Sequence, residues 1–103
     1  LLLERYPVIL LPQRTGPLLE VDEDLRSAAH LRQLLHEFAP SVTFNLLGLP
    51  SAMVPTGLHG GLPTGVQLVA SRYREDLCLQ AAAAVEGELG TLVDELWQRE
   101  ARQ

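Results

Sequence analysis

The sequence predicts a mixed α/β fold, and two kinds of pattern support this. Short apolar runs bounded by proline or glycine, which are typical of strands, occur at residues 8–11, 51–56 and 64–70. Longer segments with apolar residues at helical spacing cover 22–38 and 75–90. The 103 residues are 47% hydrophobic and 20% charged, a balance typical of globular chains. We therefore expect one domain, or part of one, with about three strands and three to four helices.

The run Val8-Ile9-Leu10-Leu11 predicts the first strand. It is entered from Pro7 and left at Pro12, and it is continuously apolar with branched residues. This pattern favours a strand that is buried on both faces. The following segment, residues 13–17, contains a glycine and a proline and predicts a loop.

The next segment predicts an amphipathic helix over 22–38. Its acidic start, Asp22-Glu23-Asp24, suits a helix N-terminus, where the helix dipole favours negative charge. We expect Pro40 to stop this helix. Ser41 is then the expected N-cap of a short helical turn, which Gly48 ends.

Two Gly-Leu-Pro triplets, 48–50 and 61–63, surround a predicted pair of strands. The strands at 51–56 and 64–70 are separated by a glycine-rich loop. The sequences around the two triplets do not align, so they do not form a structural repeat. We interpret them as the boundaries of a hairpin. Beyond it, the acidic start and Gly90 predict a helix over 75–90, and 91–103 predicts a final helix.

Charge and composition exclude several classes of function. The net charge is −5 and the eight basic residues, all arginine, are scattered along the chain, so we expect no nucleic-acid partner. The absence of lysine removes Schiff-base and serine–lysine chemistry from these 103 residues acting alone. Cys78 is the single cysteine, which fits a reducing, cytoplasmic compartment. No run is apolar enough to predict a membrane span.

No residue pattern predicts a metal, a cofactor or a nucleophile. His30 and His36 are six residues apart on one predicted helix and therefore lie on different faces. Cys78 falls on the apolar side of its helix, as a buried small hydrophobe would. His59 lies in the glycine loop, where it is either a binding residue or an ordinary exposed one. The glycines of this loop allow a phosphate cradle, but a hairpin loop explains them equally well.

The segment from Phe44 to Glu86 resembles the carboxyl-terminal part of the amidase signature family, and residues 4–17 resemble the strand that precedes this part. The resemblance covers about residues 4–90. The matching positions are Asn45, Gly48-Leu49-Pro50, Val54-Pro55-Thr56-Gly57, Gly61-Leu62-Pro63, Gly65-Val66-Gln67-Leu68 and the helix from Asp76 to Glu86.

The resemblance implies amide hydrolysis by a serine nucleophile, with a second serine and a lysine that relay the proton. In the family these groups lie in the amino-terminal and central parts, so no catalytic residue transfers to this chain. Residues 1–103 would be the C-terminal segment of the amidase domain, with 91–103 as a helix or tail. The strands would join one large mixed sheet covered by helices. Loops after strand ends would shape the substrate pocket, which makes Gln13, Arg14 and Thr15 the candidate binding residues.

Three functional alternatives follow. The chain is the C-terminal portion of an amidase and inactive alone, or a non-catalytic oligomerising module derived from that fold, or part of a glutamyl-tRNA amidotransferase A subunit. The chain begins at Leu1 rather than methionine, through trimming or because upstream sequence is missing. We expect its partner to be the remainder of an amidase chain or a second copy, with a small amide bound only in the complete enzyme.

Overall fold

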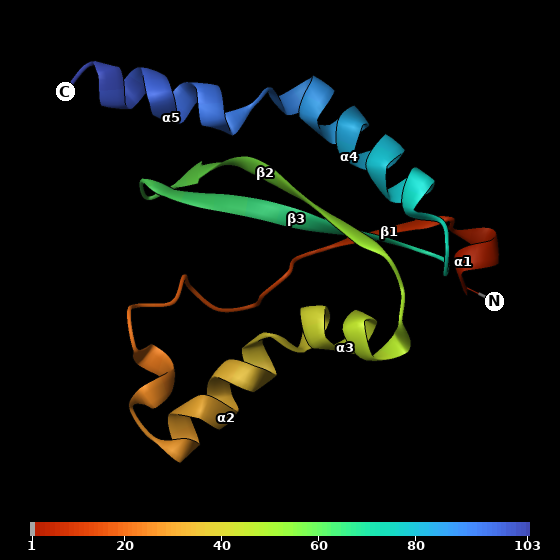
Figure 1. The fold of residues 1–103 in the computed structure, drawn as a ribbon, viewed down its shortest axis with the longest axis horizontal. Coiled ribbons are helices and arrows are strands. Elements are labelled where there is room, and N and C mark those ends of the chain that lie inside the picture. The colour runs from red at the N-terminus through yellow and green to blue at the C-terminus, as the bar shows by residue number, and fades with distance from the viewer. Residues whose placement is uncertain (1) are drawn as a thin grey trace.

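A three-stranded antiparallel sheet organises residues 2–103, the part of the chain that the computed structural model describes (Figure 1). The strands are β1 (Val8–Leu11), β2 (Ser51–His59) and β3 (Leu62–Ala70), in the order β1-β3-β2. Helices α4 and α5 lie on one side of the sheet, and α2 and α3 lie on the other (Figure 1). The predicted mixed α/β fold and its three strands are confirmed.

The β2–β3 hairpin is longer than the sequence pattern predicts. Gly60 and Gly61 join the strands with φ angles of 59° and 80°, and His59 pairs with Leu62. Positive φ at both central residues is the geometry of a type I′ turn, whose twist matches that of a hairpin. The predicted loop over 57–63 is therefore mostly strand, and only its two central glycines form the turn.

One irregularity and one close approach shape the middle of this hairpin. The register shifts between Pro55 and Gly57, and Gly57 has a φ of 147°. Opposite the shift, a Cβ on Gly65 would lie 2.9 Å from the backbone oxygen of Val54. Glycine at 65 thus allows the two backbones to approach more closely than a side chain would permit.

Strand β1 is not buried on both faces, so that prediction is wrong. It is an edge strand of the sheet, paired only with β3 in the described part of the chain. Leu10 is 58% exposed, and the other three residues of β1 are only partly buried. The apolar run is the same, but nothing within residues 2–103 covers its outer side.

The acidic cluster at 22–24 does not start the long helix, which corrects a second prediction. Asp22 has a φ of 59°, and Glu23–Leu25 forms a separate 3₁₀ turn, η1. Helix α2 begins at Ala28 and ends at Glu37. Ser27 is its N-cap, because the Ser27 hydroxyl accepts a hydrogen bond of 3.0 Å from the His30 amide. The helix therefore begins after the serine and not at the acidic residues.

Helix α3 runs from Ala39 to Leu47 and begins earlier than predicted. Pro40 lies in its first turn, a position where the missing N–H costs nothing, so it starts this helix as well as limiting α2. Ser41 lies inside the helix, and Phe38 is the N-cap residue. Gly48, with a φ of 69°, ends α3 as predicted.

Helices α4 (Glu75–Leu89) and α5 (Leu92–Ala101) confirm the predicted C-terminal pair, while α1 (Leu2–Arg5) was not predicted. Helix α4 packs on β2 and β3 and forms most of the core with them. The buried apolar residues are Leu34, Val54, Leu68, Val69, Ala70, Cys78 and Leu92. No helix in the described residues is long and apolar enough to cross a membrane.

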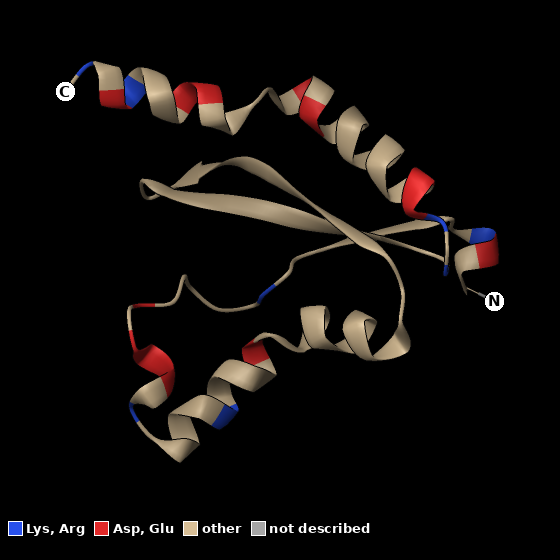
Figure 2. Ribbon diagram, viewed as in Figure 1, with Lys and Arg blue, Asp and Glu red and all other residues tan. Residues whose placement is uncertain are grey.

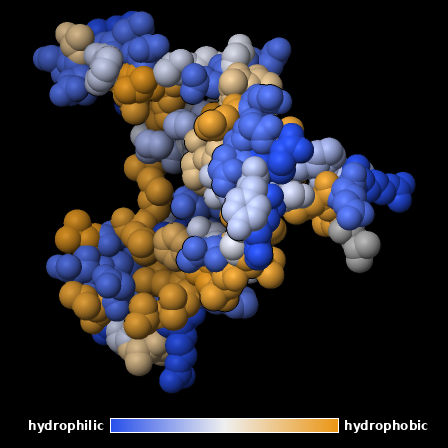
Figure 3. Space-filling model, turned by 45° about the vertical axis from the view of Figure 1, so that its right-hand side comes forward, coloured by the Kyte–Doolittle hydropathy of each residue, from blue (hydrophilic) through white to orange (hydrophobic). Residues whose placement is uncertain are grey.

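Charged and apolar residues are unevenly distributed over this fold. Asp, Glu and Arg lie on the helices and loops, whereas the three strands carry none of them (Figure 2). Apolar residues gather on the surface of the layer that contains α2 and α3 (Figure 3). Among them Leu35, Leu46 and Leu47 are each more than half exposed. These leucines of α2 and α3 therefore remain on the surface of the described structure.

Candidate functional site

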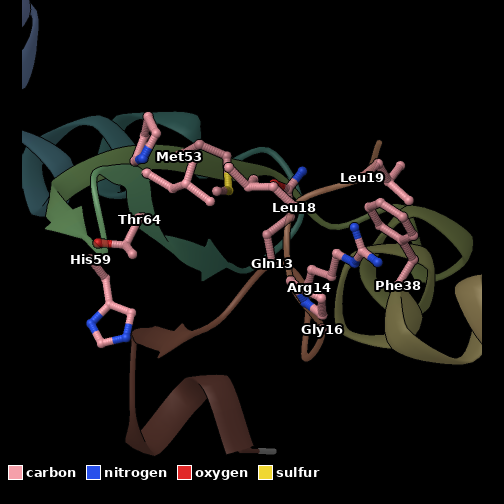
Figure 4. A pocket seen from close by; sticks show the side chains of 13 residues that line it. Gln13, Arg14, Gly16, Leu18, Leu19, Phe38, Met53, His59 and Thr64 are labelled. Atoms are coloured by element: carbon pink, nitrogen blue, oxygen red, sulfur yellow. The ribbon is translucent and has the colours of Figure 1, made fainter. Parts of the chain in front are cut away.

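A cavity of about 730 Å³ opens between the hairpin, the loop after β1 and the junction of α2 with α3. In Figure 4, Met53, His59 and Thr64 approach it from the hairpin, and Gln13, Arg14 and Phe38 from the other side. The lining residues are Gln13, Arg14, Gly16, Pro17, Leu18, Leu19, Phe38, Met53, His59, Leu62, Pro63, Thr64 and Gly65.

Two of the three predicted substrate-binding residues line this cavity. Gln13 and Arg14 do so, whereas Thr15 is not part of the lining. The Thr15 amide and hydroxyl both donate to the Glu37 carbonyl oxygen, at 3.0 and 3.3 Å. Thr15 thus attaches the loop to the end of α2. Binding of substrate by any of the three stays a prediction.

Arg14 is held firmly in the wall of the cavity. Its Nη2 donates to Glu37 Oε2 at 2.6 Å, and the two side chains are only 10% and 18% exposed. Its guanidinium carbon lies 4.9 Å from the centre of the Phe38 ring, which adds a cation–π contact. The Nε–H is buried without a hydrogen-bond partner in the described residues. The charge of Arg14 is therefore balanced by that of Glu37 within the protein itself.

Glu37 remains ionised beside this arginine. Hydrogen bonds from Arg14 and then Gln33 lower the pKa of the Glu37 carboxyl below its ordinary value. In its observed position the carboxylate also occupies the space that a Cβ on Gly16 would need. Arg14, Gly16 and Glu37 together fix the path of the loop that forms one wall of the cavity.

Several residues of the family-like motif connect the elements around the cavity through hydrogen bonds. The Asn45 carbonyl accepts a hydrogen bond of 3.2 Å from the Gly48 amide at the end of α3. The Pro50 carbonyl accepts one from the Ala70 amide, also at 3.2 Å. Gln67 is buried, and its side-chain Nε2 donates a hydrogen bond of 3.4 Å to the Pro40 carbonyl. This bond links the sheet to α3.

The remaining motif positions lie in the hairpin itself. Pro55 pairs with Gly65 beside the register shift, and Pro63 pairs with Leu58 near the turn. Gly57 and Gly61 adopt the positive φ angles described above. These residues give the hairpin its shape, which brings Pro63 and Gly65 to the cavity.

The side chains of His30 and Cys78 each have one polar contact. His30 Nε2 lies 3.0 Å from Glu23 Oε1, and no group of three possible metal ligands occurs in the described residues. Cys78 is buried, as predicted, and its thiol donates to the Pro50 carbonyl at 3.4 Å. Burial, foremost, raises the pKa of the Cys78 thiol, which keeps it protonated.

Four of the residues that line the cavity carry polar side chains, namely Gln13, Arg14, His59 and Thr64. Its lining contains no serine, cysteine, lysine or carboxylate. The one hydroxyl in the lining, that of Thr64, donates to the Gly57 carbonyl at 3.3 Å and shares a contact of 3.2 Å with the Thr56 hydroxyl. His59, the other candidate, is an exposed residue at the end of β2.

Apolar lining residues dominate the walls, and sequence patterns could not identify them as neighbours. Leu18, Phe38 and Met53 belong to a loop, a helix junction and a strand that are far apart in the chain. The two Gly-Leu-Pro triplets mark the boundaries of the hairpin but do not predict which segments lie beside it.

Comparison with known proteins gives a consistent family assignment. A family model described as Amidase matches residues 1–79. An indoleacetamide hydrolase of Bradyrhizobium japonicum is 46% identical over 99 residues, which cover 95% of this chain and 21% of that protein. A 6-aminohexanoate-cyclic-dimer hydrolase of Paenarthrobacter ureafaciens is 38% identical over 94 residues, covering 82% of this chain and 19% of the relative.

A third kind of relative is an amidotransferase. The A subunit of the glutamyl-tRNA(Gln) amidotransferase of Mesorhizobium japonicum is 34% identical over 91 residues, covering 87% of this chain and 17% of the relative. The chain thus spans about a fifth of the length of these curated relatives.

Proposed function

Because this chain belongs to the amidase family, we propose that it is the C-terminal structural portion of an amide-hydrolysing enzyme. The observation that carries the proposal is the cavity wall, which offers apolar surface, neutral polar groups and the paired Arg14 but no serine, cysteine or lysine. The catalytic serines and lysine would then lie outside these 103 residues, which contain no lysine. On this proposal residues 1–103 are one segment of the amidase domain.

Hydrolysis of an amide needs three things at the reacting carbonyl. A nucleophile attacks the carbon, N–H donors stabilise the oxyanion that forms, and an acid protonates the leaving amine. This chain would supply none of these, but it would position the substrate against them. The hairpin, the loop at 13–19 and the Arg14–Glu37 pair together form a wall with a fixed shape, and fixed orientation itself accelerates reactions.

The partner of the chain would be the remainder of the amidase polypeptide. Two features support this: the outer edges of β1 and β2, which are unpaired within residues 2–103, and the exposed apolar residues of α2 and α3. Free strand edges and exposed apolar surface favour association with a further segment. A buried free thiol at Cys78 suits a reducing compartment, so we propose the cytoplasm as its location.

Two alternatives keep the same fold. The exposed edges and apolar surface equally favour a non-catalytic module that oligomerises with a second copy. Similarity to an amidotransferase A subunit favours an enzyme that transfers an amide nitrogen rather than releasing it. The wall of the cavity serves either chemistry.

The proposal is tested by incubating the purified chain with a fluorophosphonate probe and with simple aryl amides. We expect no covalent adduct by intact-mass measurement and no released amine, because no activated serine is present. The indoleacetamide hydrolase relative, treated in parallel, is the positive control. A stoichiometric adduct on any serine or threonine of this chain would overturn the proposal.

A further inference from the structure

We propose that the contact between His30 and Glu23 is a pH-sensitive latch, which fastens one end of the cavity-lining segment 16–19 to α2 and loosens as the pH rises through neutrality. The proposal goes beyond the proposed function, because it concerns the attachment of a cavity wall and holds whichever chemistry the cavity serves. It rests on the different ways in which the two ends of the segment are attached to α2.

Segment 16–19 lines the cavity without making hydrogen bonds of its own. Gly16, Pro17, Leu18 and Leu19 all belong to the lining, and within residues 2–103 none of them donates or accepts a hydrogen bond. Leu18 and Leu19 are 53% and 46% exposed. The position of this wall is therefore set by the attachments on either side of it.

The attachment before the segment does not depend on pH near neutrality. Arg14 binds the Glu37 carboxylate, and the Thr15 amide donates to the Glu37 carbonyl at the end of α2. An arginine stays protonated at every physiological pH. The pKa of Glu37 is lowered, foremost by the hydrogen bond from Arg14, so this ion pair persists on both sides of neutrality.

The attachment after the segment passes through Glu23 to the first turn of α2. The Glu20 amide, which directly follows the segment, donates to Glu23 Oε2 at 2.9 Å. Glu23 Oε1 in turn lies 3.0 Å from His30 Nε2. The Glu23 and His30 side chains are only 13% and 23% exposed, so salt screens their contact incompletely. Within residues 2–103 no other ion pair or side-chain hydrogen bond joins η1 to α2.

Arg26 cannot replace His30 in this attachment. Its Nη1 lies 3.9 Å from Glu23 Oε1, and its Nη2 pairs with Glu20. Both contacts stay inside the stretch 20–26 and do not reach α2. If His30 loses its charge, Arg26 still neutralises Glu23, but it holds Glu23 to its own turn rather than to the helix.

The other charged groups near the latch do not titrate close to neutrality. The negative charge of Glu23 also acts on Glu37, whose own charge Arg14 balances. Helix α3, which packs on α2, carries no charged residue. The remaining charged or titratable side chains of η1, its N-cap and α2 are exposed, namely Asp22, Asp24, Arg32 and His36.

Protonation of His30 strengthens the latch. The Glu20 amide, foremost, and the His30 side chain lower the pKa of the Glu23 carboxyl below its ordinary value of 4.5, so Glu23 is ionised above that pH. An imidazole ordinarily changes its charge between about pH 5 and pH 8. On the acid side of this range the two partners carry opposite charges. On the alkaline side the imidazole is neutral, and the attraction between charges is lost although the hydrogen bond remains.

The test measures hydrogen exchange in the polypeptide of the native transcript, at whatever length it is encoded, so that every neighbour of the segment is present. The amides of Glu20, Glu23, Leu25 and Arg26 donate to hydrogen bonds within 20–26, and peptide-resolved mass spectrometry follows them together. After correction for the intrinsic pH dependence of exchange, their protection should fall about threefold from pH 5.5 to pH 8, the scale of a partly exposed ion pair. The Thr15 amide, at the first attachment, should keep its protection.

Variants assign the change to the latch. His30→Gln retains a side-chain donor for Glu23 but carries no charge, so the protection of 20–26 should stay at its alkaline level at both pH values. Glu23→Gln removes the opposite charge and should abolish the pH dependence as well. His36→Gln replaces an exposed histidine of the same helix and is the matched control, which should behave like the unchanged protein.

The proposal is overturned if the unchanged protein shows equal protection of 20–26 at both pH values, if His30→Gln retains the pH dependence, or if His36→Gln abolishes it. A fluorophosphonate adduct, which would overturn the proposed function, has no bearing on this comparison. The two experiments therefore fail separately.

Discussion

At the scale of single residues, close contacts with the backbone of a neighbouring segment explain two positions of the family-like motif. Gly65 allows the hairpin backbones to meet, and Gln67 joins β3 to the start of α3 through the Pro40 carbonyl. The sequence identified both positions by resemblance only. Their physical roles became clear when the register shift and the position of Pro40 were known, because neither follows from local sequence.

Gly65→Ala should destabilise the chain. The added Cβ would meet the Val54 backbone oxygen at 2.9 Å, so the strands must separate, at a cost of about 1–3 kcal/mol in the free energy of unfolding. Urea denaturation followed by circular dichroism measures this change.

Gly87→Ala is the matched control for this substitution. Gly87 lies inside α4 with no atom within 4 Å of its added Cβ, and alanine there should stabilise the helix by about 0.5–1 kcal/mol. Equal effects of the two substitutions would contradict the close approach at Gly65.

The attachment of the loop to α2 should weaken in acid. The pKa of Glu37 is lowered, so its bond to Arg14 stabilises the loop at any pH above the ordinary value of 4.5 and is lost as the pH falls below that value through the lowered pKa. The Thr15 amide, which donates to the Glu37 carbonyl, should therefore shift in NMR spectra recorded from pH 6 to pH 2.5.

Glu37→Gln should abolish this local titration, because the glutamine has no acidic proton. The paired Asp76, whose pKa Arg74 lowers, keeps its own transition and provides the internal control. If the chemical shift of the Thr15 amide changes with pH in the same way in Glu37→Gln, that change does not report the Arg14–Glu37 bond.

At the scale of elements, the strands and helices could be predicted from sequence, but several boundaries could not. Gly48 and Gly90 ended their helices as predicted, because a positive φ strongly favours glycine. The start of α2 was misplaced, because acidic residues and Ser27 both suit a helix N-terminus and only the observed hydrogen bond decides between them. The burial of β1 was misjudged because an apolar run does not reveal whether its partner is present.

Ser27→Ala should shorten or destabilise α2. The substitution removes the hydrogen bond to the His30 amide, and loss of an N-cap side chain costs about 1 kcal/mol. Thermal unfolding gives the change in stability. Thr91→Ala is the control, because Thr91 stands at the N-cap position of α5 without making a side-chain bond. Similar losses for both variants would contradict the capping role of Ser27.

At the scale of the whole molecule, the sheet ends at two strands whose outer edges are unpaired within the described residues. Exposed apolar side chains accompany these edges, including Leu10 on β1. Free edges and apolar surface favour association. The chain studied alone should therefore associate with itself in a concentration-dependent way, as sedimentation velocity would show.

Leu10→Lys should reduce this association, because a charged side chain on an edge strand opposes further pairing. Val21→Lys changes a more exposed apolar residue that lies outside the sheet, so it serves as the control. A chain that is monomeric at all concentrations would contradict the need for a partner.

The cavity is the feature that sequence patterns could predict least. Gln13 and Arg14 were identified from the rule that loops after strand ends line sites, and both do line it. Met53 and Phe38 could not be identified, because their proximity results from the folding of distant segments. A single sequence also gives no indication that Glu37 balances the charge of Arg14.

The most direct measurement for the central claim is the coding sequence immediately upstream of the Leu1 codon in the native transcript. Our account predicts that the frame continues upstream into a segment that carries the two serines and the lysine implied by the resemblance to the amidase family. A frame that opens at or just before Leu1, with no such segment, would contradict the account and favour the oligomerising module.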